Sequence, residues 1–189
     1  MALKRYIGLY DNILPLETVS SLTKFCANLN YKKALVGGGV EKEHIRKVWD
    51  YPLDNSVSNM TQIKWHNFLK HIFINTVQKY IFETVHQGAH DISPGKIMEL
   101  NALKYDEGGH YVYHTDFFHL HPRQFSLILL LNNDYKGGEL VFNNPKFDEE
   151  YKIETRPGRL IVWPSNFLFP HKVNVVEGGK RFSIVGWSH

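Results

Sequence analysis

The chain has 189 residues, of which 43% are hydrophobic and 14% aromatic, so it can bury one full core and is expected to form a single domain over residues 1–189. The net charge is +3 with Lys and Arg scattered, which gives no indication of a nucleic-acid partner. No apolar run is long enough for a membrane span or signal peptide, so we expect no membrane partner and a cytoplasmic location. The single cysteine, Cys26, excludes an internal disulfide and a Cys-rich zinc site.

Residues 1–94 are expected to be mainly helical support. Apolar residues recur at helical spacing from about Leu14 to Leu29, where Pro15 suits the first turn, and again from about Asn59 to His86. Both apolar stripes are most simply core. The intervening segment from Gly37 to Tyr51 begins with three glycines but lacks the spacing of a phosphate-binding motif. It is predicted to be a flexible loop, and its role is left open.

The remaining segment, residues 95–189, changes to short runs of β-forming residues separated by turns. The runs are Ile97 to Tyr105, His110 to Tyr113, Phe125 to Leu131, Glu139 to Phe142, Tyr151 to Glu154, Arg159 to Trp163, Lys172 to Val176 and Arg181 to Trp187. About eight short strands predict an α+β fold whose core is a jelly roll, or double-stranded β-helix, with two sheets facing each other.

Two segments far apart in the chain carry candidate metal ligands. His114 and Asp116 are two residues apart, so on an extended segment both side chains point to one face and reach one ion. His171 is expected to add the third ligand from the opposing sheet. Two histidines and one carboxylate suit a non-haem Fe(II) centre, because they bind one face of the metal and leave the rest open.

Other histidines near this segment offer an alternative. His110, His119 and His121 flank the motif, and a cluster of histidines is able to bind zinc. They lack Cys partners, however, and an all-His site leaves His171 unexplained. We therefore expect His119 and His121 to form a loop beside the metal.

A series of motifs in the second half resembles one known family. The motifs are Tyr105, Gly108, Tyr111, His114 and Asp116; Arg123, Ser126, Leu131 and Asn132; Gly137-Gly138-Glu139-Leu140; Pro157-Gly158-Arg159-Leu160; and His171, Arg181-Phe182-Ser183 and Trp187. In this order they resemble the Fe(II)- and 2-oxoglutarate-dependent oxygenases, and within them the prolyl 4-hydroxylase-like branch. The resemblance covers roughly residues 97 to 188.

The resemblance implies a role for each of these site residues. His114, Asp116 and His171 would bind iron, and Arg181, ten residues after His171, would pair with the distal carboxylate of 2-oxoglutarate through its planar guanidinium. Lys180 points to the opposite face of a strand, whereas Ser183 shares the face of Arg181.

One position departs from the family. Many animal-type prolyl hydroxylases have a Tyr directly before the Leu-Asn pair, where this chain has Leu130. Tyr105 and Ser183 are the candidates for a second anchor of the co-substrate.

The implied reaction uses O2 and 2-oxoglutarate, releases succinate and CO2, and has ascorbate as reductant. The expected substrate is a protein or peptide in which proline becomes 4-hydroxyproline. Arg123, Tyr111, Trp187 and the loop from Gly37 to Tyr51 are candidates for its groove, although aromatic residues at such spacings also serve as core.

Other functions remain open at this stage. They are hydroxylation of another protein side chain, an oxygenase acting on a small molecule, and a non-catalytic jelly-roll or cupin-like module that binds a metal and a small acid. The compact chain favours a microbial or viral source, and the sequence does not predict the oligomeric state.

Overall fold

The two helices of the computed structural model follow the predicted amphipathic segments closely. The structure describes residues 3–35, 39–56, 58–84, 92–117, 122–144 and 149–189. Helix α1 spans Leu16–Ala27 and starts after Pro15, and α2 spans Met60–Thr84. Asn59 caps α2, since its side-chain oxygen accepts hydrogen bonds from the backbone N–H groups of Thr61 and Gln62. In the part of the chain described, no helix is long and apolar enough to cross a membrane.

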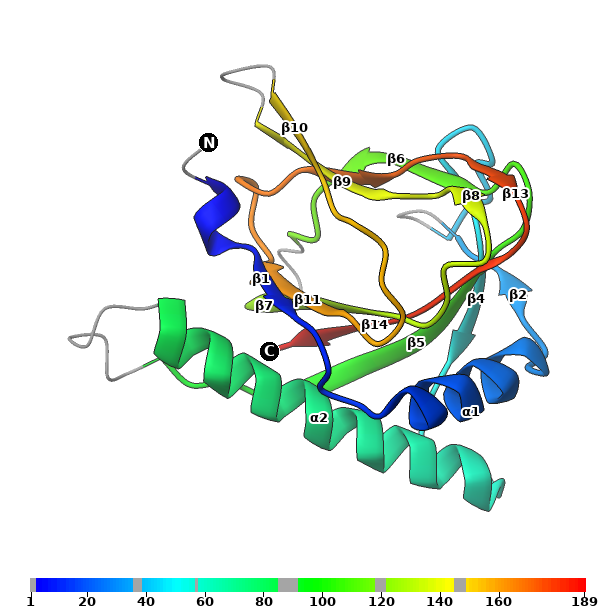
Figure 1. Ribbon diagram of the computed structural model, residues 1–189, viewed down its shortest axis with the longest axis horizontal. Helices are drawn as coiled ribbons and strands as arrows, with labels where there is room; N and C mark the ends of the chain where they lie inside the picture. Colours follow the sequence, from blue (N-terminus) through cyan, green and yellow to red (C-terminus); the bar gives the residue numbers. More distant parts are fainter. Residues whose placement is uncertain (1–2, 36–38, 57, 85–91, 118–121, 145–148) are drawn as a thin grey trace.

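A seven-stranded antiparallel sheet, here called the major sheet, forms the floor of the fold. Its strands in spatial order are β1 (Gly8–Tyr10), β11 (Leu160–Pro164), β7 (Phe125–Leu130), β14 (Arg181–Ser188), β5 (Ile97–Tyr105), β4 (Trp49–Pro52) and β2 (Lys32–Lys33). Both helices lie along its outer face (Figure 1).

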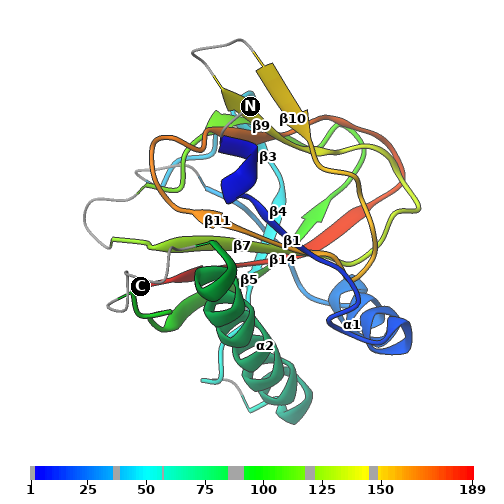
Figure 2. The same cartoon turned by 60° about the vertical axis from the view of Figure 1, so that its left-hand side comes forward.

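A five-stranded sheet, the minor sheet, faces the inner side of the major sheet. Its order is β10 (Glu149–Lys152), β9 (Leu140–Asn144), β12 (His171–Val173), β6 (His110–His114) and β3 (Arg46–Lys47). A separate pair joins β8 (Lys136–Gly137) to β13 (Val176–Gly178). Figure 2 shows the two layers with the helices on one side only. The predicted double-stranded β-helix is therefore confirmed.

The alternation of side chains along the central strands separates two apolar cores. On β5, Leu100 and Ala102 pack with the helices, while Leu103 and Tyr105 face the space between the sheets. Because successive residues of a strand point to opposite faces, one strand serves both cores. The helices thus hold the floor of the inter-sheet space in place.

The first half contains more than helical support. The strands β1, β2 and β4 extend the major sheet, and β3 extends the minor sheet. The expectation of mainly helical structure in residues 1–94 is incomplete because these strands have only two to four residues, too few for an alternating pattern to stand out. The predicted run from Lys172 to Val176 is also divided, between β12 and β13.

A buried ion pair ties the N-terminal segment to the major sheet. The Arg159 side chain is 6% exposed and donates two hydrogen bonds of 2.7 Å from Nε and Nη2 to the two carboxylate oxygens of Asp11. The hydrogen bonds from Arg159 lower the pKa of Asp11. The contribution of this pair to stability is therefore complete above about pH 4 and is lost as the pH falls through the lowered pKa of Asp11.

We predict that Asp11→Asn lowers the free energy of unfolding by about 1–3 kcal/mol at pH 7, because it leaves the buried guanidinium with only the longer, exposed ion pair to Glu154 at 3.8 Å. Urea denaturation measures the difference, which should shrink at acid pH as Asp11 of the parent protein becomes protonated. Glu41→Gln, which alters the exposed pair with Lys33, is the control and should leave the stability at pH 7 unchanged. Equal stability of Asp11→Asn and the parent at pH 7 would contradict this role.

Candidate metal centre and active-site cavity

Two histidines lie side by side on neighbouring strands of the minor sheet. His114 ends β6, His171 begins β12, and the two are direct partners in the β6–β12 register, with ring centroids 4.3 Å apart. The expectation that His171 comes from the opposing sheet is therefore wrong. Sequence spacing gives the face of a residue on its own strand but not which distant strand pairs with it.

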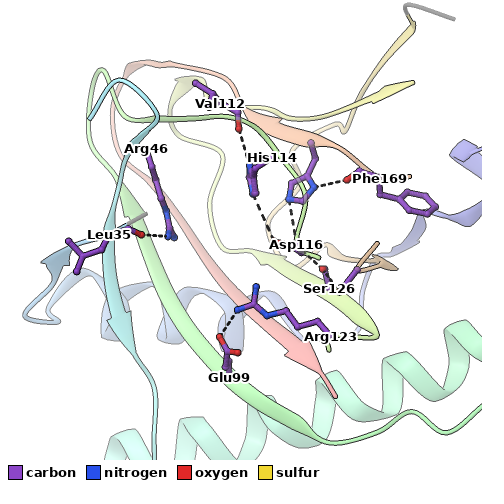
Figure 3. Close-up of polar contacts among 11 residues, drawn as sticks. Leu35, Arg46, Glu99, Val112, His114, Asp116, Arg123, Ser126 and Phe169 are labelled. Carbon is purple, nitrogen blue, oxygen red and sulfur yellow. Dashed lines mark hydrogen bonds and ion pairs between the residues drawn. The ribbon is translucent and has the colours of Figure 1, made fainter. Parts of the chain in front are cut away.

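Backbone carbonyls fix the orientation of both rings (Figure 3). The Nδ1 atom of His114 donates to the carbonyl of Val112 at 2.9 Å, and Nδ1 of His171 donates to the carbonyl of Phe169 at 3.0 Å. Since a carbonyl only accepts, Nδ1 carries a proton in both rings, and Nε2 is the nitrogen that lies near Asp116. A ligand histidine is typically held in this way, with one nitrogen bonded to the protein and the other directed to the metal.

Asp116 completes a three-residue cluster just beyond the end of β6. Its carboxylate oxygens lie 3.9 Å from Nε2 of His114 and 3.6 Å from Nε2 of His171. Ser126 on β7 donates a hydrogen bond of 2.6 Å to Oδ2 of Asp116, so the major sheet positions the carboxylate. The ligand atoms all lie within 4.8 Å of one another, which fits a single ion bound on one face by two histidines and a carboxylate.

The electrostatics of the cluster favour the metal-binding forms. Burial, together with the nearness of His171, lowers the pKa of His114 to about 3. Burial alone would raise the pKa of Asp116, but His171, His114 and the Ser126 hydroxyl outweigh it and hold that pKa below its usual range. At neutral pH the cluster therefore offers a neutral imidazole at His114 and an ionised carboxylate at Asp116, which are the forms that bind a metal.

The alternative histidine cluster gains no support from the described residues. His110 directs Nδ1 to the carbonyl of Gly108. Within the described ranges, the only group of three or more potential ligands close enough together to hold one ion is His114, Asp116 and His171. The expected loop positions of His119 and His121 lie outside the described residues.

The cluster opens into a cavity of about 190 Å³ between the sheets. One wall is the inner face of β5, which contributes alternate residues at positions 99, 101, 103 and 105. The adjacent strand β14 contributes Val185 and Trp187. The same alternation that divides the two cores therefore builds the cavity wall.

Arg181 and Ser183 continue the same face of β14 beyond the residues that line the cavity. Arg181 is 1% exposed, lies opposite Tyr105 in the β5–β14 register, and donates a hydrogen bond of 3.0 Å to the Ser183 hydroxyl. Its Nε and Nη2 atoms have no hydrogen-bond partner among the described residues. A buried guanidinium with open donors fits a carboxylate ligand such as one end of 2-oxoglutarate. Lys180 is exposed, as the strand alternation predicts.

The three candidate substrate residues line the cavity. The guanidinium carbon of Arg123 lies 3.9 Å from a ring centroid of Trp187, and Arg123 also forms an ion pair of 2.8 Å with Glu99 (Figure 3). Tyr111 stacks on the ring of His114, with centroids 3.5 Å apart and an interplanar angle of 15°. Tyr111 thus packs against a candidate metal ligand and also borders the cavity.

Two charged cavity residues, Arg46 and Asp50, come from the segment between Gly37 and Tyr51, which was predicted as a candidate for the groove without any single residue being indicated. Residues 37 and 38 of this segment lie outside the described residues. The expectation of a flexible loop is wrong for its second half, where β3 and β4 form. The guanidinium of Arg46 lies over Tyr111 at 4.8 Å and donates to the carbonyl of Leu35. Burial raises the pKa of Asp50. The charged character of this segment was visible, but only the pairing of β3 with β6 and of β4 with β5 brings the two residues to the cavity.

We predict that Ser126→Ala weakens metal binding by roughly 10- to 100-fold, because residues that orient a ligand typically contribute this much to affinity. Anaerobic titration with Fe(II) measures the effect. The exposed Ser21→Ala should bind the metal like the parent protein and serves as the control. Unchanged affinity in Ser126→Ala would show that the hydrogen bond to Asp116 does not orient the carboxylate.

Comparison with known proteins agrees with this geometry. Residues 100–189 match the model of the 2OG-Fe(II) oxygenase superfamily. A PKHD-type hydroxylase of Crocosphaera subtropica is 28% identical over 186 residues, which are 95% of this chain and 76% of that protein.

Two solved structures share the fold. A prolyl-4-hydroxylase of Pseudomonas putida is similar with a TM-score of 0.72 at 22% identity, over 97% of this chain and 92% of its own. A prolyl hydroxylase of Trichoplax adhaerens, in complex with a hypoxia inducible factor peptide fragment, is similar with a TM-score of 0.78 at 17% identity, over 97% and 83%. The matched segment holds all three candidate metal ligands, and residues 100–189 belong to the 2OG-Fe(II) oxygenase superfamily.

Proposed function

We propose that this protein is a peptidyl hydroxylase that uses Fe(II), 2-oxoglutarate and O2 to convert a proline residue of a protein or peptide to 4-hydroxyproline, with ascorbate as reductant. The observation that carries the proposal is the cluster of His114, Asp116 and His171 at a cavity next to the buried, open guanidinium of Arg181. This pairing of a metal site with an anion site is what the co-substrate requires.

In this proposal the chain's own residues bind and orient the reactants. His114, Asp116 and His171 hold the metal on one face, and Arg181 binds the distal carboxylate with Ser183 supporting its guanidinium. When bound, iron and 2-oxoglutarate supply the oxidising chemistry: O2 and the 2-oxo acid yield succinate and CO2, and one oxygen atom enters a substrate C–H bond.

Apolar and charged side chains share the lining of the cavity. Leu103, Leu140, Val173 and Val185 line it together with the metal ligands, and Glu99 and Asp50 line it as well. This mixed lining suits a substrate residue with an apolar ring and a polar main chain.

Two observations support a peptide as the substrate. The similar Trichoplax protein was solved with a peptide fragment bound, and the similar Pseudomonas protein is a prolyl-4-hydroxylase. In this chain Arg123, stacked on Trp187 and paired with Glu99, provides a rigid polar and aromatic surface at the cavity. Arginine and aromatic side chains are common contact residues in interfaces, so this surface suits an extended peptide.

We predict that Arg181→Ala raises the 2-oxoglutarate concentration for half-maximal succinate formation by roughly two orders of magnitude, since truncating one partner of a buried charged contact costs about 3 kcal/mol. Lys180→Ala is the matched control, because the neighbouring side chain is exposed and points to the other face. The same 2-oxoglutarate requirement in Arg181→Ala and Lys180→Ala would exclude Arg181 as the anchor.

The substrate class is tested with peptides that differ only in whether a proline or an alanine occupies one position. Incubation with Fe(II), 2-oxoglutarate, O2 and ascorbate should add one oxygen atom to the proline peptides alone, as measured by mass spectrometry, with an equal amount of succinate. A gain of oxygen irrespective of proline would place the target on another residue. Metal and 2-oxoglutarate binding without succinate from any peptide would contradict the proposed activity.

A further inference from the structure

The neighbouring strand β7 gives the distal carboxylate anchor no polar side chain. Leu130 is buried on β7 and lies directly opposite Ser183 in the β7–β14 register. A leucine side chain has no polar atom, so it gives the co-substrate no hydrogen bond. Ser183 on β14 accepts a hydrogen bond from Arg181 and keeps its own hydroxyl hydrogen. A further donor beside Arg181 would come from another element.

Tyr135 lies next to Arg181 from the turn that precedes β8. At Gly138 a Cβ atom would lie 3.1 Å from Cε2 of Tyr135 and 3.2 Å from Cδ of Arg181. Both side chains therefore pack against the bare backbone of Gly138, whose φ of +67° also favours glycine. The Gly137-Gly138 motif thus has a structural reason, because a side chain at position 138 would separate Tyr135 from Arg181.

Three polar atoms at this place lack a hydrogen-bond partner in the described structure: the Tyr135 hydroxyl, which donates and accepts, and two guanidinium nitrogens of Arg181, which only donate. The Tyr135 ring packs against the core between the sheets, and its hydroxyl is buried. Neither that hydroxyl nor Nε and Nη2 of Arg181 has a hydrogen-bond partner in the described parts of the chain. Buried polar groups are normally paired, and a carboxylate is the group that only accepts hydrogen bonds. An anion is therefore the ligand that satisfies this set.

We propose that Tyr135 donates its hydroxyl hydrogen bond to the distal carboxylate of 2-oxoglutarate, beside Arg181. The inference rests on the proposed function, since it assumes that Arg181 binds this carboxylate. It adds a binding residue that the family motifs do not indicate. Tyr105, whose ring lies 5.0 Å from the Arg181 guanidinium and also lines the cavity, connects the anchor to the metal side.

The test is the affinity for 2-oxoglutarate, measured by calorimetry on the full-length protein loaded with Mn(II), so that no turnover is needed. Tyr135→Phe removes the hydroxyl and keeps the ring, and it should weaken binding by roughly 10- to 100-fold, the range for a hydrogen bond to a charged group. Tyr6→Phe, at an exposed tyrosine, is the matched control and should bind like the parent protein.

A second ligand separates direct contact from a general effect on packing. 2-Oxopentanoate keeps the chelating end of 2-oxoglutarate but lacks the distal carboxylate, so Tyr135→Phe and the parent protein should bind it equally. The melting temperature of the ligand-free variant should not fall, because the lost hydroxyl has no partner in the described structure.

Unchanged 2-oxoglutarate affinity in Tyr135→Phe would overturn the inference while leaving the proposed function in place. An equal loss of affinity for both 2-oxo acids would overturn it as well, because the hydroxyl would then act through packing. If the parent protein bound no 2-oxoglutarate, the proposed function itself would fail, and the inference with it.

Discussion

The alternation of side chains along β5 and β14 is the constraint on which the rest of the structure depends. One face of these paired strands packs on α1 and α2, and the other forms the wall of the active-site cavity and carries Arg181 and Ser183. A shift of one residue in this pairing would turn the arginine toward the helices and an apolar residue toward the cavity. The same packing therefore determines both the stability of the major sheet and the position of Arg181.

The charges of the site are balanced for its ligands. In the proposed function, Asp116 brings one negative charge to a divalent metal and Arg181 brings one positive charge to a dicarboxylate, so the metal, the co-substrate and these two residues together are neutral. Each charge alone is unfavourable in a buried place. Binding of the metal and the co-substrate would therefore compensate the buried charges of Asp116 and Arg181.

The sequence predicted the candidate metal ligands better than the pairing of the strands that carry them. His114 and Asp116 were predicted together because they are two residues apart on one extended segment, and His171 and Arg181 because of their place in the family motifs. The expected place of His171 in the opposing sheet was wrong, since strand pairing is decided by packing between distant segments. Arg46 and Asp50 were not singled out for the same reason: their strands are too short to be recognised, and only tertiary pairing brings them to the cavity. Tyr135 was not predicted as a site residue, because its proximity to Arg181 depends on the bare backbone of Gly138.

Residues from β6, from the segment after it and from β12 form one metal site. Anomalous diffraction at the iron absorption edge, from crystals grown without oxygen in the presence of Fe(II), tests it most directly. We expect one peak per chain, within bonding distance of Nε2 of His114, Nε2 of His171 and a carboxylate oxygen of Asp116. A peak held by His110 or by other histidines, with His171 left unbound, would contradict it.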